Sequence, residues 1–285
     1  MARVLTGLII GVAWLLLLLL APPVIFWLVI CLLALLALQE YAAMLLRGGG
    51  ESRWRRPFVL LALLPVLSAV SAEPLWIAGG AMAAFAGLLL LSLAATQASE
   101  HGGHEVSGPA FDFLPRAVLG IFYPALLLAH FPLLLAQPAG RSWLLLAAII
   151  AVAADTGAYY AGTRLGRHKL CPALSPGKTV EGLIGGVVAA MLGSFLVVWW
   201  WLSEIGLLQS LLFAFILSLA SVVGDLVESL LKRGAGLKDS GTLLPGHGGL
   251  LDRIDSLLLV VPLLYYLVLL TERLRPVIST SYLPW

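Results

Sequence analysis

The residues best suited to chemistry lie in one stretch of an otherwise apolar chain, from Ser221 to Asp255. This stretch contains four of the six aspartates and two of the four lysines among the 285 residues. Charge within an apolar chain is costly and usually marks a functional site. A second polar segment, Asp155 to Glu181, contains a fifth aspartate and the other two lysines. We expect the two segments to fold together at one membrane surface and to bind a nucleotide through a metal ion.

Three aspartates are the candidate metal ligands. Asp225 lies inside an apolar run, where Ser229 shares its helical stripe and Glu228 lies near the same face. Asp252 and Asp255 open the last apolar span, and their spacing places both carboxylates on one helical face. Hard divalent cations such as Mg²⁺ take carboxylate oxygens together with water and substrate phosphate. Capping of the helix start is the alternative role for the pair, and the addition of Asp225 favours metal.

The segment between these aspartates is rich in basic residues and glycines that suit phosphate. Its basic residues, Lys232, Arg233 and Lys238, can neutralise phosphate oxygens. The tripeptide His247-Gly248-Gly249 precedes a predicted helix start, where backbone N–H groups and the helix dipole favour an anion. The alternative is a flexible connection between helices, which the many charged residues make the weaker interpretation.

The second polar segment offers a further set of phosphate-binding groups. Asp155 ends an apolar run, and Ser175, Lys178 and Thr179 lead into the next span. Lys178 and Thr179 resemble a phosphate grip in kind, although the spacing of a Walker A loop is absent. A basic loop with a helix cap explains these residues equally well. Glu181 lies in a first helical turn, where dipole complementarity alone accounts for an acid.

The composition predicts helices in a membrane as the elements that position these residues. The chain is 61% hydrophobic and 11% charged, with a mean hydropathy of +1.02. Several apolar runs reach the length that crosses a bilayer, and none alternates like a membrane barrel strand. We therefore predict an all-α polytopic bundle, with an N-terminal region at 1–140 that serves as a scaffold and could give access to lipid, and a catalytic region at 141–285. The nine predicted spans lie near 4–21, 23–46, 57–72, 74–97, 115–136, 142–162, 180–202, 207–232 and 250–272.

The basic loops predict the orientation of this bundle. Lys and Arg follow the second, sixth and eighth spans, which are alternate connections and can lie on one, cytoplasmic side. The N-terminus is then inside, and residues 1–20 are interpreted as a retained first helix. The polar loop Gln97–Pro115 contains His101, His104 and Glu105, for which a surface loop is favoured over a metal site. The net charge of +2 gives no argument for nucleic acid.

The two polar segments together resemble the signature of the phosphatidate cytidylyltransferases, also called CDP-diacylglycerol synthases. The main match reads Ser229-x₂-Lys232-Arg233-x₄-Lys238-Asp239-x-Gly241-x₂-Leu244-Pro245-x-His247-Gly248-Gly249-x₂-Asp252-Arg253-x-Asp255. The upstream match reads Asp155-x-Gly157-Ala158-Tyr159-x₂-Gly162 and Ser175-Pro176-x-Lys178-Thr179-x-Glu181-Gly182. Thr163 departs from the pattern, because a basic residue is implied there, and Arg164 follows it. In the N-terminal half, Glu40-Tyr41 is only a faint similarity.

The resemblance implies the reaction CTP + phosphatidate → CDP-diacylglycerol + pyrophosphate at a bacterial inner membrane. It implies Mg²⁺, with a second ion that could be monovalent, and CTP, phosphatidate and membrane lipids as partners. Asp225, Asp252 and Asp255 are then the metal ligands. The further catalytic residues are Lys232, Arg233, Lys238, Asp239 and Arg253, and the substrate-binding residues are Asp155, Ser175, Lys178, Thr179, Glu181, Ser229, His247, Gly248 and Gly249. A homodimer is compatible with the sequence, which does not fix the oligomeric state.

Two other classes of protein compete with this interpretation. The first is another membrane enzyme, either a lipid kinase that uses CTP or a CDP-alcohol phosphotransferase. The motif of the phosphotransferases is absent, because Ser256 follows the Asp252-x₂-Asp255 pair where a glycine is implied. The second is a transporter or channel, whose charges should cluster near the middle of the membrane. Here the charges fall at helix ends and in loops, which favours surface chemistry.

Overall fold

The computed structural model describes the chain except for residues 1, 47–53, 101–107, 201–205, 244–247 and 282–285. Within the described residues, helices dominate and one short two-stranded sheet accompanies them. The helices are α1 (Ala2–Leu20), α2 (Pro23–Leu45), α3 (Arg55–Ala62), α4 (Leu64–Ser68), η2 (Ala69–Ser71), α5 (Pro74–Glu100), α6 (Gly108–Gly120), η3 (Ile121–Leu126), α7 (Leu127–Leu135), α8 (Gly140–Leu165), α9 (Val180–Trp200), α10 (Leu207–Gly234) and α11 (Leu251–Ser281). Strands β1 (Lys169–Cys171) and β2 (Ser175–Thr179) lie between α8 and α9. The predicted all-α class is confirmed.

Seven helical segments of the described residues are long and apolar enough to cross a membrane. They are Pro23–Leu45, Pro74–Ala94, Asp112–Leu135, Gly140–Leu165, Val180–Trp200, Leu207–Gly234 and Leu251–Arg273. The first predicted span corresponds to α1, of which Gly11–Leu20 forms a shorter apolar helix. The third is divided into α3, α4 and η2, because Pro65 at the start of α4 has no N–H to continue a helix. The protein is polytopic, but the predicted count of nine spans is not confirmed.

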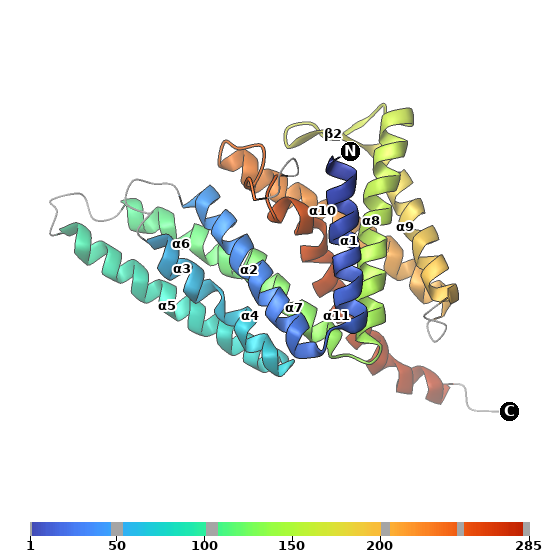
Figure 1. Cartoon of the computed structure of the whole chain (residues 1–285), viewed down its shortest axis with the longest axis horizontal. Helices are drawn as coiled ribbons and strands as arrows, with labels where there is room; N and C mark the ends of the chain where they lie inside the picture. Colours follow the sequence, from blue (N-terminus) through green and yellow to red (C-terminus); the bar gives the residue numbers. More distant parts are fainter. Residues whose placement is uncertain (1, 47–53, 101–107, 201–205, 244–247, 282–285) are drawn as a thin grey trace.

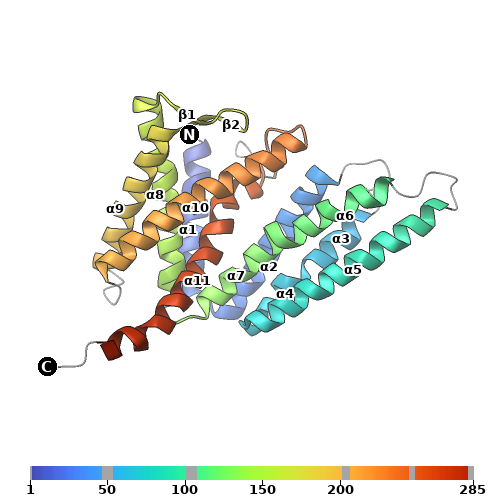
Figure 2. The ribbon, with the colours of Figure 1, turned by 180° about the vertical axis from the view of Figure 1, so that it is seen from behind.

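The helices form two groups that meet at α11. In Figure 1, α2 to α7 lie to one side of α11, α8 and α9 lie to the other, and α10 starts beside α9 and crosses α11. Figure 2 shows the same division from behind. The carboxyl ends of α2, α8 and α10 share one face of the bundle with the β1–β2 hairpin, whereas α11 runs toward the opposite face. The three basic stretches of the sequence follow these three helix ends, so they begin at one face of the bundle.

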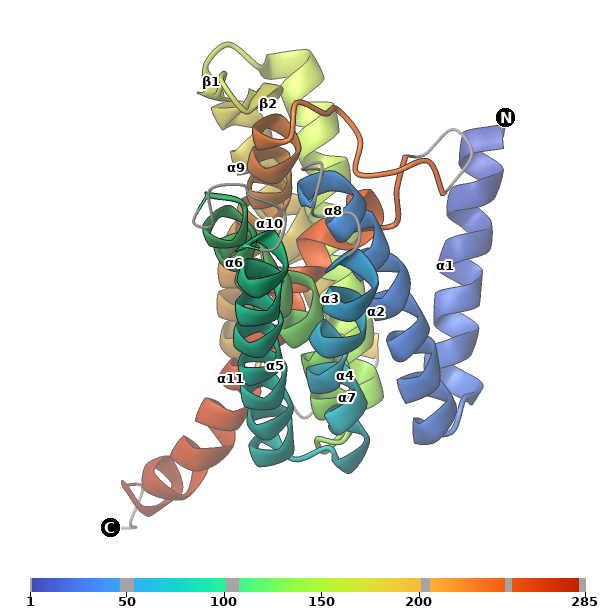
Figure 3. The ribbon, with the colours of Figure 1, turned by 90° about the vertical axis from the view of Figure 1, so that its left-hand side faces the viewer.

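Helix α1 lies at the edge of the bundle and is tied to the start of α8 (Figure 3). The Arg141 guanidinium donates hydrogen bonds to the carbonyl oxygens of Leu18 at 2.8 Å, Leu19 at 2.6 Å and Ala21 at 2.8 Å. Carbonyls at the end of a helix have no intrahelical N–H partner. Arg141 therefore satisfies the end of α1, and its charge suits the negative end of the helix dipole.

Helices α8 and α9 pack closely because small residues line their contact. A Cβ added at Gly186 would lie 2.7 Å from the carbonyl oxygen of Ala154, and one at Gly182 would lie 2.9 Å from that of Ala158. Close backbone approach through small residues is a common way for helices to associate in membranes. This contact fixes α8, which carries Asp155, against the start of α9, which follows directly on the hairpin.

The β1–β2 hairpin was not predicted, because its short strands contain no alternating apolar pattern. The strands are antiparallel, with Lys169 opposite Thr179 and Cys171 opposite Ser175. The Lys169 ammonium also donates to the carbonyl oxygen of Pro176 at 2.8 Å. The hairpin turns the second polar segment back toward the end of α8, so that Ser175 to Thr179 lie beside α8 and α9 at one face of the bundle.

The polar loop predicted over Gln97–Pro115 is shorter in the structure. Helix α5 continues to Glu100 and α6 begins at Gly108. Alanine, glutamine and glutamate near the end of α5 are good helix formers, so helix propensity exceeds the loop-like polarity there. The residues of the weaker metal hypothesis, His101, His104 and Glu105, lie outside the described residues.

Candidate active site

Three carboxylates from two helices meet near the basic face of the bundle. Asp225 and Glu228 come from α10, and Asp255 comes from the first turns of α11. One oxygen of each lies within 4.8 Å of the others. The approach depends on Gly224, because a Cβ there would lie 2.5 Å from the backbone oxygen of Asp255. Neighbouring carboxylates repel one another, so a cation placed among them would stabilise the group.

Two lysines form ion pairs with this group. The Lys178 ammonium, at the end of β2, lies 2.7 Å from Asp225 Oδ2. The Lys232 ammonium, on α10, lies 2.8 Å from Glu228 Oε2 and 2.6 Å from Asp252 Oδ1. The two predicted polar segments therefore meet, since Lys178 belongs to one and Asp225 to the other. The site therefore contains ammonium groups, which can bind phosphate, next to carboxylates, which can hold a cation.

Asp252 is held by donors on both of its oxygens. Oδ1 accepts from Lys232, and Oδ2 accepts the backbone N–H groups of Ser240 at 3.0 Å and Gly249 at 2.8 Å, together with the Ser240 hydroxyl at 3.0 Å. Gly248 adopts φ +79°, in the left-handed region that glycine favours. A Cβ at Gly248 would also lie 2.6 Å from Asp252 Oδ2. Asp252 thus holds the segment that precedes α11 and pairs with Lys232 in one arrangement.

Glu228 was noted in the sequence near the Asp225 face but was not assigned to the site. Its side chain is fully buried, and its Oε1 has no hydrogen-bond partner among the described residues. An unsatisfied buried carboxylate oxygen is costly, and a bound cation would satisfy it. The donor set of Asp225, Glu228 and Asp255 consists of hard oxygens and fits Mg²⁺. The spacing of three residues between Asp225 and Glu228 was the signal in the sequence.

A polar cavity of about 370 Å³ lies beside the carboxylates. It is bounded by the hairpin, α8, α9 and α10, and its polar lining residues are Asp155, Ser175, Lys178, Thr179 and Asp225. Thr179 is buried, and its hydroxyl accepts the N–H of Gly182 at 3.0 Å, so it caps the start of α9. The cavity therefore brings the predicted phosphate-binding residues of the second segment to Asp225.

The other predicted residues lie at varied distances from this centre. Ser229 donates to Asp225 Oδ1 at 3.4 Å, and Glu181 accepts the backbone N–H of Arg167 at 3.0 Å at the base of the hairpin. Four of the predicted charged residues are exposed, namely Arg233, Lys238, Asp239 and Arg253. At the position of the departure from the family pattern, the Thr163 hydroxyl bonds its own helix and the Arg164 guanidinium lies 5.7 Å from the ring centre of Tyr160. His247 lies outside the described residues.

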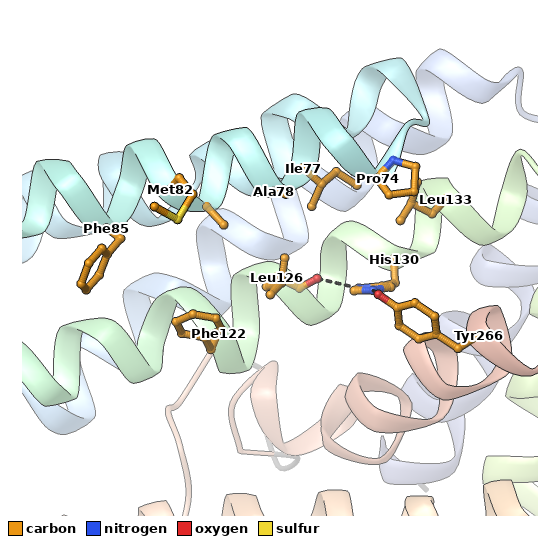
Figure 4. Close-up of a pocket in the computed structure, with 11 residues that line it drawn as sticks. Pro74, Ile77, Ala78, Met82, Phe85, Phe122, Leu126, His130, Leu133 and Tyr266 are labelled. Carbon is orange, nitrogen blue, oxygen red and sulfur yellow. Dashed lines mark hydrogen bonds between the residues drawn. The ribbon is translucent and has the colours of Figure 1, made fainter.

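A larger cavity of about 600 Å³ has a different chemical character (Figure 4). It lies between α5, η3, α7 and α11 and is lined mainly by apolar side chains such as Met82, Phe85 and Phe122. His130 lies at its edge, where Nδ1 is 2.8 Å from the Leu126 carbonyl oxygen and Nε2 is 3.3 Å from the Tyr266 hydroxyl. The lining suits hydrocarbon and offers no ammonium or guanidinium to a phosphate. Of these two cavities, the smaller polar one, which Lys178 lines, is therefore the candidate for phosphate binding.

The fold and this site define a polytopic membrane protein with an acidic, lysine-paired centre near one face of its helix bundle. Residues 1–271 match the model of the Cytidylyltransferase family, so the chain belongs to that family.

Named relatives agree with this family. The chain is 45% identical over 130 residues to a phosphatidate cytidylyltransferase of Staphylococcus saprophyticus, covering 46% of this chain and 50% of the relative. It is 45% identical over 131 residues to a phosphatidate cytidylyltransferase of Bacillus subtilis, covering 46% and 49%. An uncharacterised Escherichia coli protein, YnbB, is 47% identical over 114 residues, covering 40% and 38%. The matched stretch spans about half the length of the two named enzymes.

Proposed function

We propose that the protein transfers a cytidylyl group from CTP to phosphatidate and releases CDP-diacylglycerol and pyrophosphate. The observation that carries the proposal is the meeting of two lysines with a three-carboxylate cluster beside a polar cavity. Lys178 and Lys232 each contact a member of the cluster, at 2.7 and 2.8 Å. Both substrates are polyanionic phosphates, and their encounter requires positive charge in a fixed arrangement. The family and the names of the relatives support the same reaction.

The reaction requires the protein mainly to position the two substrates and to neutralise their negative charge. An oxygen of the phosphatidate phosphate attacks the α-phosphorus of CTP, while the bond from that phosphorus to the bridging oxygen breaks. The electron pair of that bond leaves with pyrophosphate. The attacking phosphate is already anionic, so it requires little help from a general base. Lys232, with Arg233 at the exposed end of α10 and Lys238 in the segment that follows it, is proposed to hold the triphosphate, as cations do in other phosphoryl transfers.

The second polar segment is proposed to hold phosphate from either substrate. Lys178 and Ser175 line the cavity of about 370 Å³, and Asp155 lines its far wall on α8. Ser175 and Lys178 are held in place by the hairpin, and together with Asp155 they can face a phosphate that enters from the bilayer. The acyl chains of phosphatidate can then stay in the membrane.

Asp225, Glu228 and Asp255 are proposed to hold Mg²⁺. Asp252 stays a predicted metal ligand, although its carboxylate already forms an ion pair with Lys232. A bound Mg²⁺ supplies neutralisation of phosphate oxygens and of the leaving pyrophosphate. A second ion, which could be monovalent, is compatible with the number of carboxylates. The side chains of the protein orient the substrates, because Lys178 and Lys232 contact the carboxylate cluster from the two different polar segments.

The protein is proposed to lie in a bacterial inner membrane with this site on the cytoplasmic side. The support is the shared face of the hairpin and the basic helix ends, because positive residues favour the cytoplasmic side. CTP is a polyanion and does not cross a bilayer unaided. The site must therefore face the compartment that contains CTP. The division into an N-terminal scaffold at 1–140 and a catalytic region at 141–285 stays a prediction, as does the homodimer.

The direct test is pyrophosphate release by the purified protein in detergent, with phosphatidate, CTP and Mg²⁺, omitting each in turn. We expect release to require all three and CDP-diacylglycerol to accumulate in equal amount. Formation of CDP in place of pyrophosphate would identify a CTP-dependent lipid kinase. Absence of any product from well-folded protein with each nucleoside triphosphate would overturn the enzyme proposal and favour transport.

A further inference from the structure

One carboxylate of the N-terminal half reaches into the site from far away in the sequence. Glu40, on α2, accepts the backbone N–H of Leu250 through Oε1 at 2.8 Å and that of Leu251 through Oε2 at 3.0 Å. Leu251 is the first residue of α11, the helix that carries Asp252 and Asp255. The first N–H groups of a helix have no partner within it, and a carboxylate placed there is stabilised by the helix dipole.

The same carboxylate contacts the side chain that holds Asp252. The Ser240 hydroxyl lies 3.2 Å from Glu40 Oε2 and 3.0 Å from Asp252 Oδ2, so it stands between two acidic groups. Ser240 is buried, and its backbone N–H also donates to Asp252. Asp252 in turn pairs with Lys232 at 2.6 Å. A continuous polar path therefore joins Glu40 to Lys232 and the carboxylate cluster.

Two glycines around this contact leave room for the Glu40 carboxylate. A Cβ at Gly241 would lie 2.8 Å from Glu40 Oε1, and one at Gly249 would lie 2.5 Å from Glu40 Oε2. Both glycines belong to the sequence motif, which was interpreted as phosphate binding alone. Their small size also serves the insertion of Glu40 between the two ends of the connecting segment.

Helix α2 is anchored firmly enough for Glu40 to act as a fixed point. The next residue, Tyr41, is fully buried, and its hydroxyl donates to the carbonyl oxygen of Arg116 on α6 at 2.7 Å. The Tyr41 ring also packs near the ring of Phe58 on α3, with centroids 6.1 Å apart. Glu40 therefore cannot follow the start of α11 if that start moves, and it restrains the helix against the N-terminal half.

We propose that Glu40 is a positioning residue for the cytidylyl transfer, which holds the start of α11 and Ser240 so that Asp252 meets Lys232. The inference rests on the proposed function. It gives the N-terminal half a role in catalysis, where the sequence indicated a scaffold and access for lipid. Glu40 acts through other residues, so its loss should lower turnover far more than it weakens substrate binding.

The test compares Glu40→Gln, Ser240→Ala and their double variant with the unchanged protein in detergent. Gln keeps the shape but turns one accepting oxygen into an NH₂ group that faces N–H donors. We expect kcat to fall about 10- to 100-fold, as for a displaced catalytic geometry, while the KM values for CTP and phosphatidate stay within about threefold. The double variant should lie within about threefold of Glu40→Gln, because both changes break one path.

The control is Gln39→Ala, one residue earlier on the exposed side of α2, with kcat expected within about twofold of the unchanged protein. A second readout is hydrogen exchange of the amides of 248–256, which should quicken in Glu40→Gln and stay unchanged in Gln39→Ala. A Glu40→Gln variant with unaltered kcat and exchange overturns the inference and leaves the proposed function intact. An unchanged protein that makes no CDP-diacylglycerol overturns the proposed function, and the exchange measurement then still shows whether Glu40 holds α11.

Discussion

Among single residues, Lys232 occupies the centre of the polar network. It contacts Glu228 and Asp252 together, and only 13% of its side chain is exposed. A buried ion pair is weak evidence for stability, but removing one partner leaves an uncompensated charge that costs about 3–5 kcal/mol. Single substitutions in this network should therefore have large effects. The roles of the two partners of Lys232 can be distinguished by replacing each in turn.

Asp252→Asn should lower turnover by about 100-fold or more, because it removes the charge that orients Lys232. The fold should survive, since Lys232 keeps Glu228 at 2.8 Å and Asn can still accept one hydrogen bond at the start of α11. Pyrophosphate release and thermal unfolding of the purified variant measure the two effects. Asp112→Asn, an exposed carboxylate on α6, is the matched control. Near-normal turnover in Asp252→Asn would remove Asp252 from the site.

Glu228→Gln should raise the Mg²⁺ concentration needed for half-maximal activity by about tenfold or more, because the proposed metal ligand loses its charge. In Asp252→Asn the same concentration should shift less, since both oxygens of Asp252 already have donors from the protein. Titration of each variant with Mg²⁺ distinguishes the two ligand sets. A large shift in Asp252→Asn with none in Glu228→Gln would restore the set expected from the sequence, Asp225, Asp252 and Asp255.

At the scale of elements, the site depends on how closely α10 and α11 approach. The carboxylates of Asp225 and Asp255 can share a cation only because Gly224 lets the two backbones meet. The β1–β2 hairpin adds Lys178 from a third direction. The geometry of the cluster is thus set by helix packing and by the hairpin together.

Gly224→Ala should destabilise the protein by about 1–3 kcal/mol, because the added methyl group must push α10 away from Asp255. Turnover should fall by more than the loss of stability explains, since the shift of α10 also separates the carboxylates. Gly79→Ala in α5 is the control, because a Cβ there meets nothing within 4 Å. Thermal unfolding and pyrophosphate release are measured for both variants. Equal activity in the two would show that the α10–α11 distance does not limit the reaction.

At the scale of the whole molecule, the polar groups gather toward one face of a bundle that is otherwise apolar. The ends of α2, α8 and α10 and the hairpin lie on that face, and α11 leads away from it (Figure 1). The large apolar cavity lies between α5, η3, α7 and α11 and shares no lining residue with the polar cavity beside the hairpin. A transporter would be expected to line a path between the two faces with its charges, which this distribution does not favour.

Sidedness gives a prediction for the molecule in its membrane. Inverted vesicles of a bacterial inner membrane that contains the protein should use added CTP without detergent, because the proposed site then faces the medium. Right-side-out vesicles should release pyrophosphate only after detergent opens them. The measurement is the ratio of activity with and without detergent in each preparation. Full activity in intact right-side-out vesicles would place the site on the outer side and contradict the positive-inside orientation.

The sequence anticipated much of the fold and part of the site. Asp225 and Asp255 do lie together, and Lys178 of one polar segment does meet Asp225 of the other. Glu228 could have been assigned, because its spacing from Asp225 already placed it near the same helical face. For Glu40 the sequence offered only the faint family similarity at Glu40-Tyr41 and no sign of its partners, which lie more than 200 positions away.

The sequence by itself determined the membrane class, the two polar segments and the helical faces of their carboxylates. Hydropathy and helical periodicity are local properties, which act over one span or one turn and can be read along the chain. Only the tertiary structure decided that Asp252 pairs with Lys232, that Glu228 joins the cluster, and that Glu40 holds α11. Such contacts depend on how distant helices pack, where glycines such as Gly224 set the approach of backbones that no local pattern records.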